Sequence, residues 1–247
     1  MASTSETGHA KNVTNLESLI TSITAFGTSY NPSKDSIKLL ALKALLTGTK
    51  ESFNTLNTAL SAYSIAVDAR EVAFEPVGKL ITRVNNALKA SDSTIQIDES
   101  AHTIVRKLQG KRASAKLTDE EKKALEAEGK EVNQISVSQM GYDSRLDNLD
   151  KFISLLSTVS QYNPNEEDLK IDSLKTVYSD LKTKNTDVVT AYIQLDNARN
   201  NRNEILYKPL TGLVDLASDS KTYIKSVFGA TSPQYKQVSK LTFVARN

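Results

Sequence analysis

The chain has 247 residues, with 31 basic and 29 acidic side chains, a formal net charge of +2 and no cysteine. The hydrophobic content of 39% is enough for a core, in one large domain or two small ones. The near balance of charge argues against general affinity for nucleic acid, and the lack of cysteine excludes disulfides and thiolate chemistry.

The first twelve residues are polar and lack the basic and apolar regions of a signal peptide. No apolar run approaches the ~18 residues that a membrane helix needs, since even the run LLALKALL contains Lys43. We therefore expect a cytoplasmic protein with no membrane partner. Few glycines and prolines and no tryptophan are typical of an all-helical chain.

The first predicted helix covers about 12–27, where apolar residues recur on one helical stripe. These residues are Val13, Leu16, Leu19, Ile20, Ile23 and Phe26. A long helix is predicted next, over 33–75, with Asn31 or Ser33 as its cap and Asp35 in its first turn. Two heptad columns extend along it. One is Leu46, Phe53, Leu60, Val67 and Phe74, and the other is Leu42, Thr49, Leu56, Tyr63 and Arg70.

The long helix recurs in diverged form at 163–208. Both copies follow a Tyr-Asn-Pro sequence and end at a proline, Pro76 or Pro209. The matching columns of the second copy are Tyr178, Asn185, Tyr192, Arg199 and Leu206, and Leu174, Leu181, Val188, Leu195 and Arg202. The first predicted helix also has a counterpart, at about 144–160. Matching positions are 132 or 133 residues apart, which indicates an internal duplication.

A proline kinks or ends each long helix, and a helix over 77–90 follows the first one. A short helix over 98–109 comes next, with Gly110 as its C-terminal cap. In the second copy the corresponding helices can join, over about 210–228.

The predicted fold is an all-α, elongated antiparallel bundle built from two copies of a short helix, a long helix and a kinked return helix. The first repeat covers 3–113, a charged linker helix lies in 114–135, and the second repeat covers 136–247. We expect the repeats to pack together as one bundle. The tail over 231–247 is weakly strand-like, because a polar residue separates Leu241 from Phe243, and it can dock on the bundle or on a neighbouring chain.

Two Glu-x-x-His patterns suggest a metal site, since the spacing places a carboxylate and an imidazole on one helical face. They are Glu6 with His9 and Glu99 with His102. Gly8 lies inside the first pattern, and the second lies beside the apolar stripe of its helix. We therefore expect no metal and no other cofactor, and keep Glu99 and His102 only as weak candidates.

Several cations are candidates for contacts with a partner or an anion. Arg70 and Arg202 occupy the same column position in the two copies, where each can reach the helix edge, pair with a carboxylate or bind an anion. A basic cluster of Arg106, Lys107, Lys111 and Arg112 lies at the end of the short helix. It can be a solvated helix end or a contact for nucleic acid.

The sequence resembles no family known to us, and it has no nucleophile elbow, phosphate-binding glycine loop or Cys/His cluster. We expect a structural or scaffolding protein, not an enzyme, whose partner is a second copy of itself or another protein. The alternatives are a nucleic-acid- or ribosome-associated module, and a bundle that binds a metal or a small molecule in its core.

Overall fold

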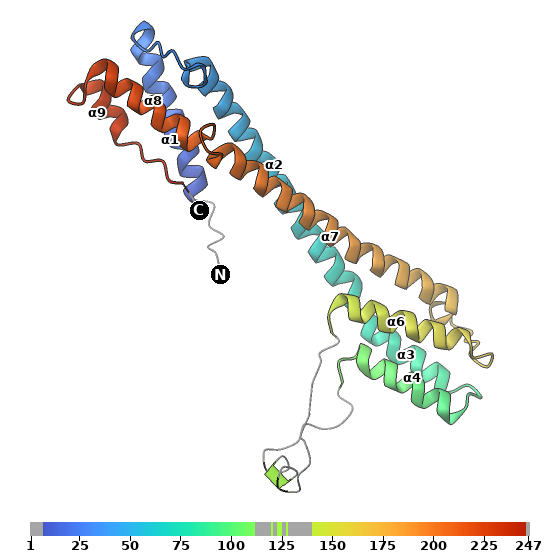
Figure 1. The fold of residues 1–247 in the computed structure, drawn as a ribbon. Coiled ribbons are helices and arrows are strands. Elements are labelled where there is room, and N and C mark those ends of the chain that lie inside the picture. The colour runs from blue at the N-terminus through green and yellow to red at the C-terminus, as the bar shows by residue number, and fades with distance from the viewer. Residues whose placement is uncertain (1–6, 112–119, 121–122, 125–126, 128–139, 246–247) are drawn as a thin grey trace. The chain divides into compact units, whose positions relative to one another are not determined.

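The computed structural model describes residues 7–111, 120, 123–124, 127 and 140–245, and every regular element in this part of the chain is helical (Figure 1). The α-helices are α1 (Thr7–Phe26), α2 (Leu39–Phe74), α3 (Val77–Lys89), α4 (Ile95–Leu108), α6 (Tyr142–Ser157), α7 (Ile171–Tyr207), α8 (Leu213–Phe228) and α9 (Pro233–Ser239). The predicted all-α class is therefore confirmed. Most of the predicted linker helix in 114–135 lies outside the described residues.

The chain divides into two compact units. Unit 1 comprises residues 1–63 and 191–247, and unit 2 comprises residues 64–190. Their borders fall inside α2 and α7, so each long helix contributes residues to both units. The sequence repeats at 3–113 and 136–247, and their packing as one bundle, stay predictions.

Both long helices begin later than predicted. A 3-10 turn comes first in each case, η2 (Asp35–Ile37) before α2 and η3 (Glu167–Leu169) before α7. The hydroxyl of Tyr30 donates to the carbonyl oxygen of Ile37 at 2.7 Å, and Tyr162 does the same to Leu169 at 2.7 Å. Because Ile37 and Leu169 are buried there, the turn contributes to the core in a way that a straight helix start would not.

The core of unit 2 lies among α3, α4, α6, η3 and the first part of α7. Its largest fully buried side chains are Ile81, Leu88, Leu149, Phe152, Leu156, Leu174 and Leu181. Arg83 of α3 donates to both carboxylate oxygens of Asp168 in η3 at the surface of this unit. The ion pair fixes η3 against α3, in addition to the apolar packing.

The core of unit 1 has the same kinds of element: α1, η2, the first part of α2, the end of α7, and α8 with α9. Its buried apolar side chains include Leu16, Leu19, Ile23, Leu42, Leu206, Leu213, Ala217 and Ile224. Phe26 packs on Phe228 and Tyr30 packs edge-on against Tyr223, with ring centroids 5.2 Å apart in each pair.

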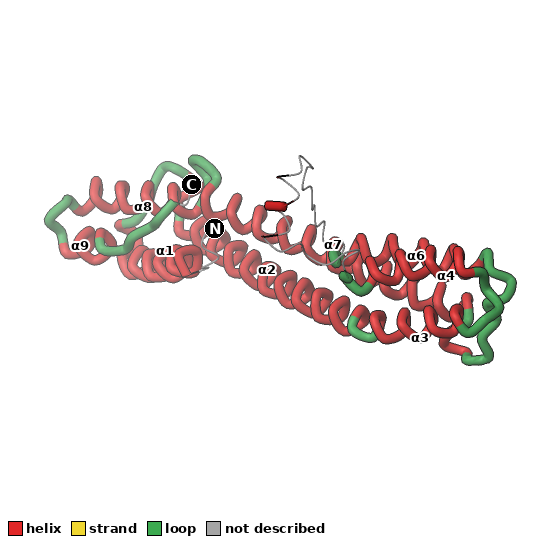
Figure 2. The backbone as a smooth tube through the Cα atoms, turned by 90° about the horizontal axis from the view of Figure 1, so that it is seen from below, coloured by secondary structure: helices red, strands yellow, loops and turns green. Residues whose placement is uncertain are grey.

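The prolines end the long helices. α2 stops at Phe74 and α3 begins at Val77, while α7 stops at Tyr207 and α8 begins at Leu213. Figures 1 and 2 both show α3 continuing beyond the end of α2, and α8 beyond the end of α7. The predicted return helix was therefore wrong, because a proline break of two to five residues redirects the chain without reversing it.

Two glycines hold helix ends in place. Gly110 has φ +68°, its N–H donates to Lys107, and the N–H of Lys111 donates to Arg106. This Schellman motif confirms the predicted cap. Gly212 lies in the turn after Pro209, where an added Cβ would be 2.7 Å from the backbone nitrogen of Lys208.

Candidate functional site

The pairing of α2 with α7 in unit 1 leaves large apolar side chains exposed. Leu56 of α2 packs with Leu195 and Ala198 of α7, and Tyr63 packs on Tyr192 with ring centroids 5.9 Å apart. This small cluster uses the second predicted heptad column, which is buried in both long helices at Leu42, Thr49, Leu56, Leu174, Leu181, Val188, Leu195 and Arg202.

The first predicted column is exposed in the same region. Leu60 is 47% exposed and Tyr192 is 51% exposed, and the neighbouring Ile193 is 53% exposed. Each of these side chains would gain from being removed from water. We call Leu60, Tyr192 and Ile193 the α2/α7 surface. Because the heptad pattern calls for burial where this structure leaves exposure, the surface is a candidate for contact with a partner.

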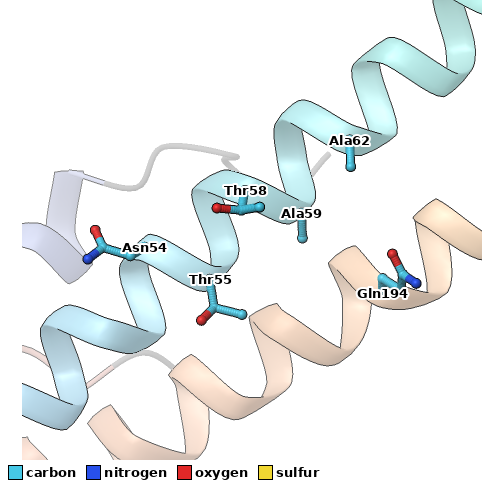
Figure 3. Close-up of a pocket in the computed structure, with 6 residues that line it drawn as sticks. All are labelled: Asn54, Thr55, Thr58, Ala59, Ala62 and Gln194. Atoms are coloured by element: carbon cyan, nitrogen blue, oxygen red, sulfur yellow. The ribbon is translucent and has the colours of Figure 1, made fainter.

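A shallow hollow lies on the same pair of helices (Figure 3). It is lined by Asn54, Thr55, Thr58, Ala59 and Ala62 of α2 and Gln194 of α7. The α2 side chains are short, so another helix can approach the backbone closely here. The described residues that line the hollow are uncharged.

A second candidate site in unit 1 surrounds the C-terminal segment. Leu241 and Phe243 pack against the unit 1 core, and the buried side chains of Asn12 and Asn15 on α1 bond the main chain of this segment. Of the two dockings that the sequence leaves open for the tail, residues 241–244 show the one on their own chain. The weakly strand-like interpretation of the tail was wrong, because Pro233–Ser239 form α9 and residues 241–245 form no strand. His9, also buried on α1, lies 2.6 Å from the hydroxyl of Tyr207.

Arg70, in unit 2, contacts an amide and an aromatic ring. Its Nη1 donates to Asn185 at 3.0 Å, and its guanidinium lies 3.9 Å from the centre of the Tyr142 ring. A second arginine in this unit, Arg145 of α6, donates to the carbonyl oxygen of Phe74 at 3.0 Å. Burial lowers the pKa of Arg145. Neither guanidinium forms an ion pair within the described residues.

Arg202 belongs to unit 1 and is 4% exposed. Its guanidinium donates to the side-chain oxygen of Asn203 at 2.8 Å. Such burial leaves little of the side chain for a ligand, so the structure favours a packing role at this position. The expected equivalence with Arg70 holds for the sequence position, but Arg70 is only half-buried.

The basic cluster lies at the end of α4 in unit 2. Arg106 and Lys107 are half-buried in its last turn, and Lys111 is exposed just beyond Gly110. Arg112 lies outside the described residues. Cations at this helix end interact favourably with its dipole.

The predicted metal candidates do not come together with other ligands. Glu99 and His102 are exposed on α4, and no group of three or more possible ligands occurs among the described residues. His9 bonds Tyr207, while Glu6 lies outside the described part of the chain. No helix in that part of the chain is both long and apolar enough to span a membrane.

The regular elements of the described residues are thus all helical, and their candidate sites are an exposed apolar surface, a shallow hollow and the surroundings of the C-terminal segment. Comparisons with protein-family models, with curated proteins and with solved structures find no match to this chain. Its function must therefore be inferred from the contacts just described.

Sequence reasoning missed the asparagine pair on α1. A signal was present, because Asn12 and Asn15 extend the apolar stripe of Leu16 and Leu19 by one turn. Buried amides at such positions require hydrogen-bonding partners. The partner is a main-chain segment more than 220 residues away, and a local sequence pattern cannot predict it.

Proposed function

We propose that this chain is a structural protein without catalytic activity, and that two copies associate through the α2/α7 surface. The observation that carries the proposal is the exposure of Leu60, Tyr192 and Ile193 on a helix pair. A second copy is the preferred partner because a surface that pairs with itself closes into a symmetric dimer, the commonest form of oligomer.

An internal duplication supports this proposal. We propose that the repeats at 3–113 and 136–247 descend from one unit, with their long helices antiparallel. Contacts at matching positions support it, since His9 packs on Tyr207 with centroids 5.6 Å apart and Tyr142 packs on Phe74 at 4.9 Å. Each pair joins the first helix of one repeat to the end of the long helix of the other. The matching residues of the two pairs, His9 with Tyr142 and Phe74 with Tyr207, are 133 positions apart.

Because of the duplication, α2 and α7 contribute equivalent positions to the α2/α7 surface. Leu60 and Tyr192 are 132 positions apart in the sequence, so they occupy matching column positions in the two repeats. Each repeat therefore supplies one large apolar side chain to the surface. Such a surface is close to self-complementary, which is the property that a two-fold symmetric interface requires.

Light scattering on a sizing column over a range of concentrations tests this function. We expect the mass to rise from 27.1 kDa towards twice that value with concentration. Leu60→Lys should weaken the association at least tenfold, because it places a charge in a desolvated interface. Leu40→Lys is the matched control, since Leu40 is 81% exposed on the same helix but belongs to a different part of it. A monomer at every concentration would refute the proposal, as would equal effects of the two substitutions.

A nucleic-acid-associated module is the second candidate. The observation that favours it is that Arg106, Lys107 and Lys111 form no ion pair within the described residues. These cations would displace counterions condensed on the phosphates of RNA, so the affinity would fall steeply as salt rises. A filter-binding assay with RNA at two salt concentrations tests it, and Lys107→Gln with Lys111→Gln should reduce the salt dependence.

A further inference from the structure

Asn12 binds the C-terminal segment through its main chain. Its Nδ2 donates to the carbonyl oxygen of Val244 at 2.9 Å, and its Oδ1 accepts from the N–H of Val244 at 3.1 Å. Asn15, one turn later on α1, donates to the carbonyl oxygen of Thr242 at 2.6 Å. The amide side chains therefore bond this segment as a neighbouring strand would, independently of its side chains.

Lys221 of α8 also bonds the main chain of this part of the chain. Its Nζ donates to the carbonyl oxygen of Leu241 at 2.7 Å and to that of Ser239 at 3.3 Å. The side chains of the segment alternate, as in any extended chain. Leu241 and Phe243 pack against the core, whereas Val244 is 60% exposed. We call Asn12, Asn15 and Lys221 with the core surface beside them the tail groove. It fits an extended segment with apolar side chains at alternate positions.

The amide of Asn12 has no counterpart in unit 2, whereas Asn15 corresponds to Asn148, which is also buried and donates to the carbonyl oxygen of Ser144 on its own helix. Asn12 is 1% exposed and Asn15 is 5% exposed, and burying an amide without a partner is costly. The residue 133 positions after Asn12 is Arg145, which bonds the end of α2 in unit 2. A helix of this kind can thus form its core without an amide at that position. In unit 1 the amide of Asn12 forms the pair of bonds to the tail, and its Nδ2 also donates to the Tyr207 hydroxyl at the longer distance of 3.5 Å.

We infer that the tail groove is a binding site for an extended chain segment, and that residues 241–244 of a second copy can occupy it in place of the chain's own. The side-chain hydrogen bonds to residues 241–244 come from α1 and α8, so the groove offers the same bonds to an identical segment from another molecule. Only Lys240 separates α9 from the segment. Exchange of identical elements is a low-cost route to dimers. The inference rests on the proposed self-association, and adds a second contact to it.

A peptide with the sequence of residues 239–247, labelled with a fluorophore, tests the groove. The full chain carrying Leu241→Ser and Phe243→Ser has a weakened tail and an intact groove. We expect the peptide to bind this variant saturably in fluorescence anisotropy, and to bind the wild-type chain at least tenfold more weakly, because the chain's own tail competes. Adding Asn12→Leu and Asn15→Leu should lower the affinity for the variant at least tenfold. A peptide of the same composition in scrambled order is the matched control.

The inference is overturned if the variant keeps its helix content by circular dichroism and does not bind the peptide, or binds the scrambled peptide equally well. If the variant does not fold, the wild-type chain decides. Millimolar peptide should then accelerate hydrogen exchange of the Val244 amide, which the groove protects in this structure. Unchanged exchange would overturn the inference.

Exchange between full chains is tested with a label at a cysteine introduced at Ala245, since the chain has no other cysteine. Labelled wild-type chain should be retained by an affinity-tagged copy of the weakened-tail variant, and not by one that also lacks Asn12 and Asn15. Placing Leu60→Lys in both chains removes the α2/α7 surface from the experiment. Retention that persists with Leu60→Lys supports the groove even if the proposed dimer fails, and retention that ignores the asparagines refutes it.

Discussion

Replacing Tyr162 or Tyr30 with phenylalanine tests the tyrosine turns that precede the long helices. In each turn the hydroxyl donates to a main-chain carbonyl at 2.7 Å, and both tyrosines are 7% exposed. Burial raises the pKa of Tyr162 to about 12 and also raises that of Tyr30, so both hydroxyls keep their protons near neutral pH. The phenylalanine ring preserves the packing and removes only the donor.

The free-energy cost of each substitution comes from the carbonyl oxygen that is left without its donor. The carbonyl oxygen of Leu169 or Ile37 loses its tyrosine donor, and leaving such a group buried and unsatisfied costs about 1–3 kcal/mol. We expect each substitution to lower the free energy of unfolding by about 1–2 kcal/mol, because each removes one hydroxyl donor from a main-chain carbonyl oxygen.

Urea unfolding, followed by far-ultraviolet circular dichroism, measures both effects. If the slope of the unfolding free energy against urea concentration is unchanged, the substitution has changed only the stability. Tyr235→Phe is the control, since the Tyr235 hydroxyl has no hydrogen bond within the described residues. Values within about 0.3 kcal/mol of the wild type, well below the usual worth of a hydrogen bond, would contradict the reasoning. Equal losses for Tyr235→Phe would contradict it as well.

Gly212→Ala should destabilise unit 1 by about 1–3 kcal/mol, the usual cost of overpacking, because its Cβ would lie 2.7 Å from main-chain nitrogen. Gly78→Ala in α3 meets nothing within 4 Å and should stabilise by about 0.5–1 kcal/mol; thermal unfolding compares the two. Arg83 lowers the pKa of Asp168 below its ordinary 3.8, so their ion pair stabilises the fold above that pH, and the stabilisation is lost as pH falls through the lowered pKa. Acid unfolding of Arg83→Gln should therefore depend less on pH in this window.

The helices themselves could be predicted because their signals are local. The apolar stripe of 12–27 and the heptads of the long helices require only periodicity, and Gly110 requires only its place after an amphipathic run. The delayed start of α2 could not be predicted, since it depends on a hydrogen bond from Tyr30 and on burial of Ile37. Capping residues at Asn31 and Ser33 were equally consistent with a helix that starts at once.

The candidate sites were predictable only in part. Arg70 and the cations of α4 stand out by charge, whereas Asn12 and Asn15 gain a role only from a segment that returns from the C-terminus. Leu60 fits a heptad column, and the sequence therefore predicts its burial. Periodicity identifies which face of a helix is apolar, but it contains no information on how many partners are available to cover that face.

The two candidate contacts depend differently on protein concentration, and this difference distinguishes their roles. Pairing through Leu60, Tyr192 and Ile193 competes only with water, so it is governed by the concentration of chains alone. Exchange at the tail groove competes with the chain's own segment 241–244, which is tethered next to it through Lys240 and therefore present at a high effective concentration. The tail of a second copy gains the same advantage only after the α2/α7 surfaces have paired, provided that the pairing brings it within reach. We therefore expect Leu60→Lys to slow tail exchange at low concentration while leaving it unchanged at high concentration. Asn12→Leu should reduce it at both, and an equal response of the two variants at every concentration would show that the contacts are not ordered in this way.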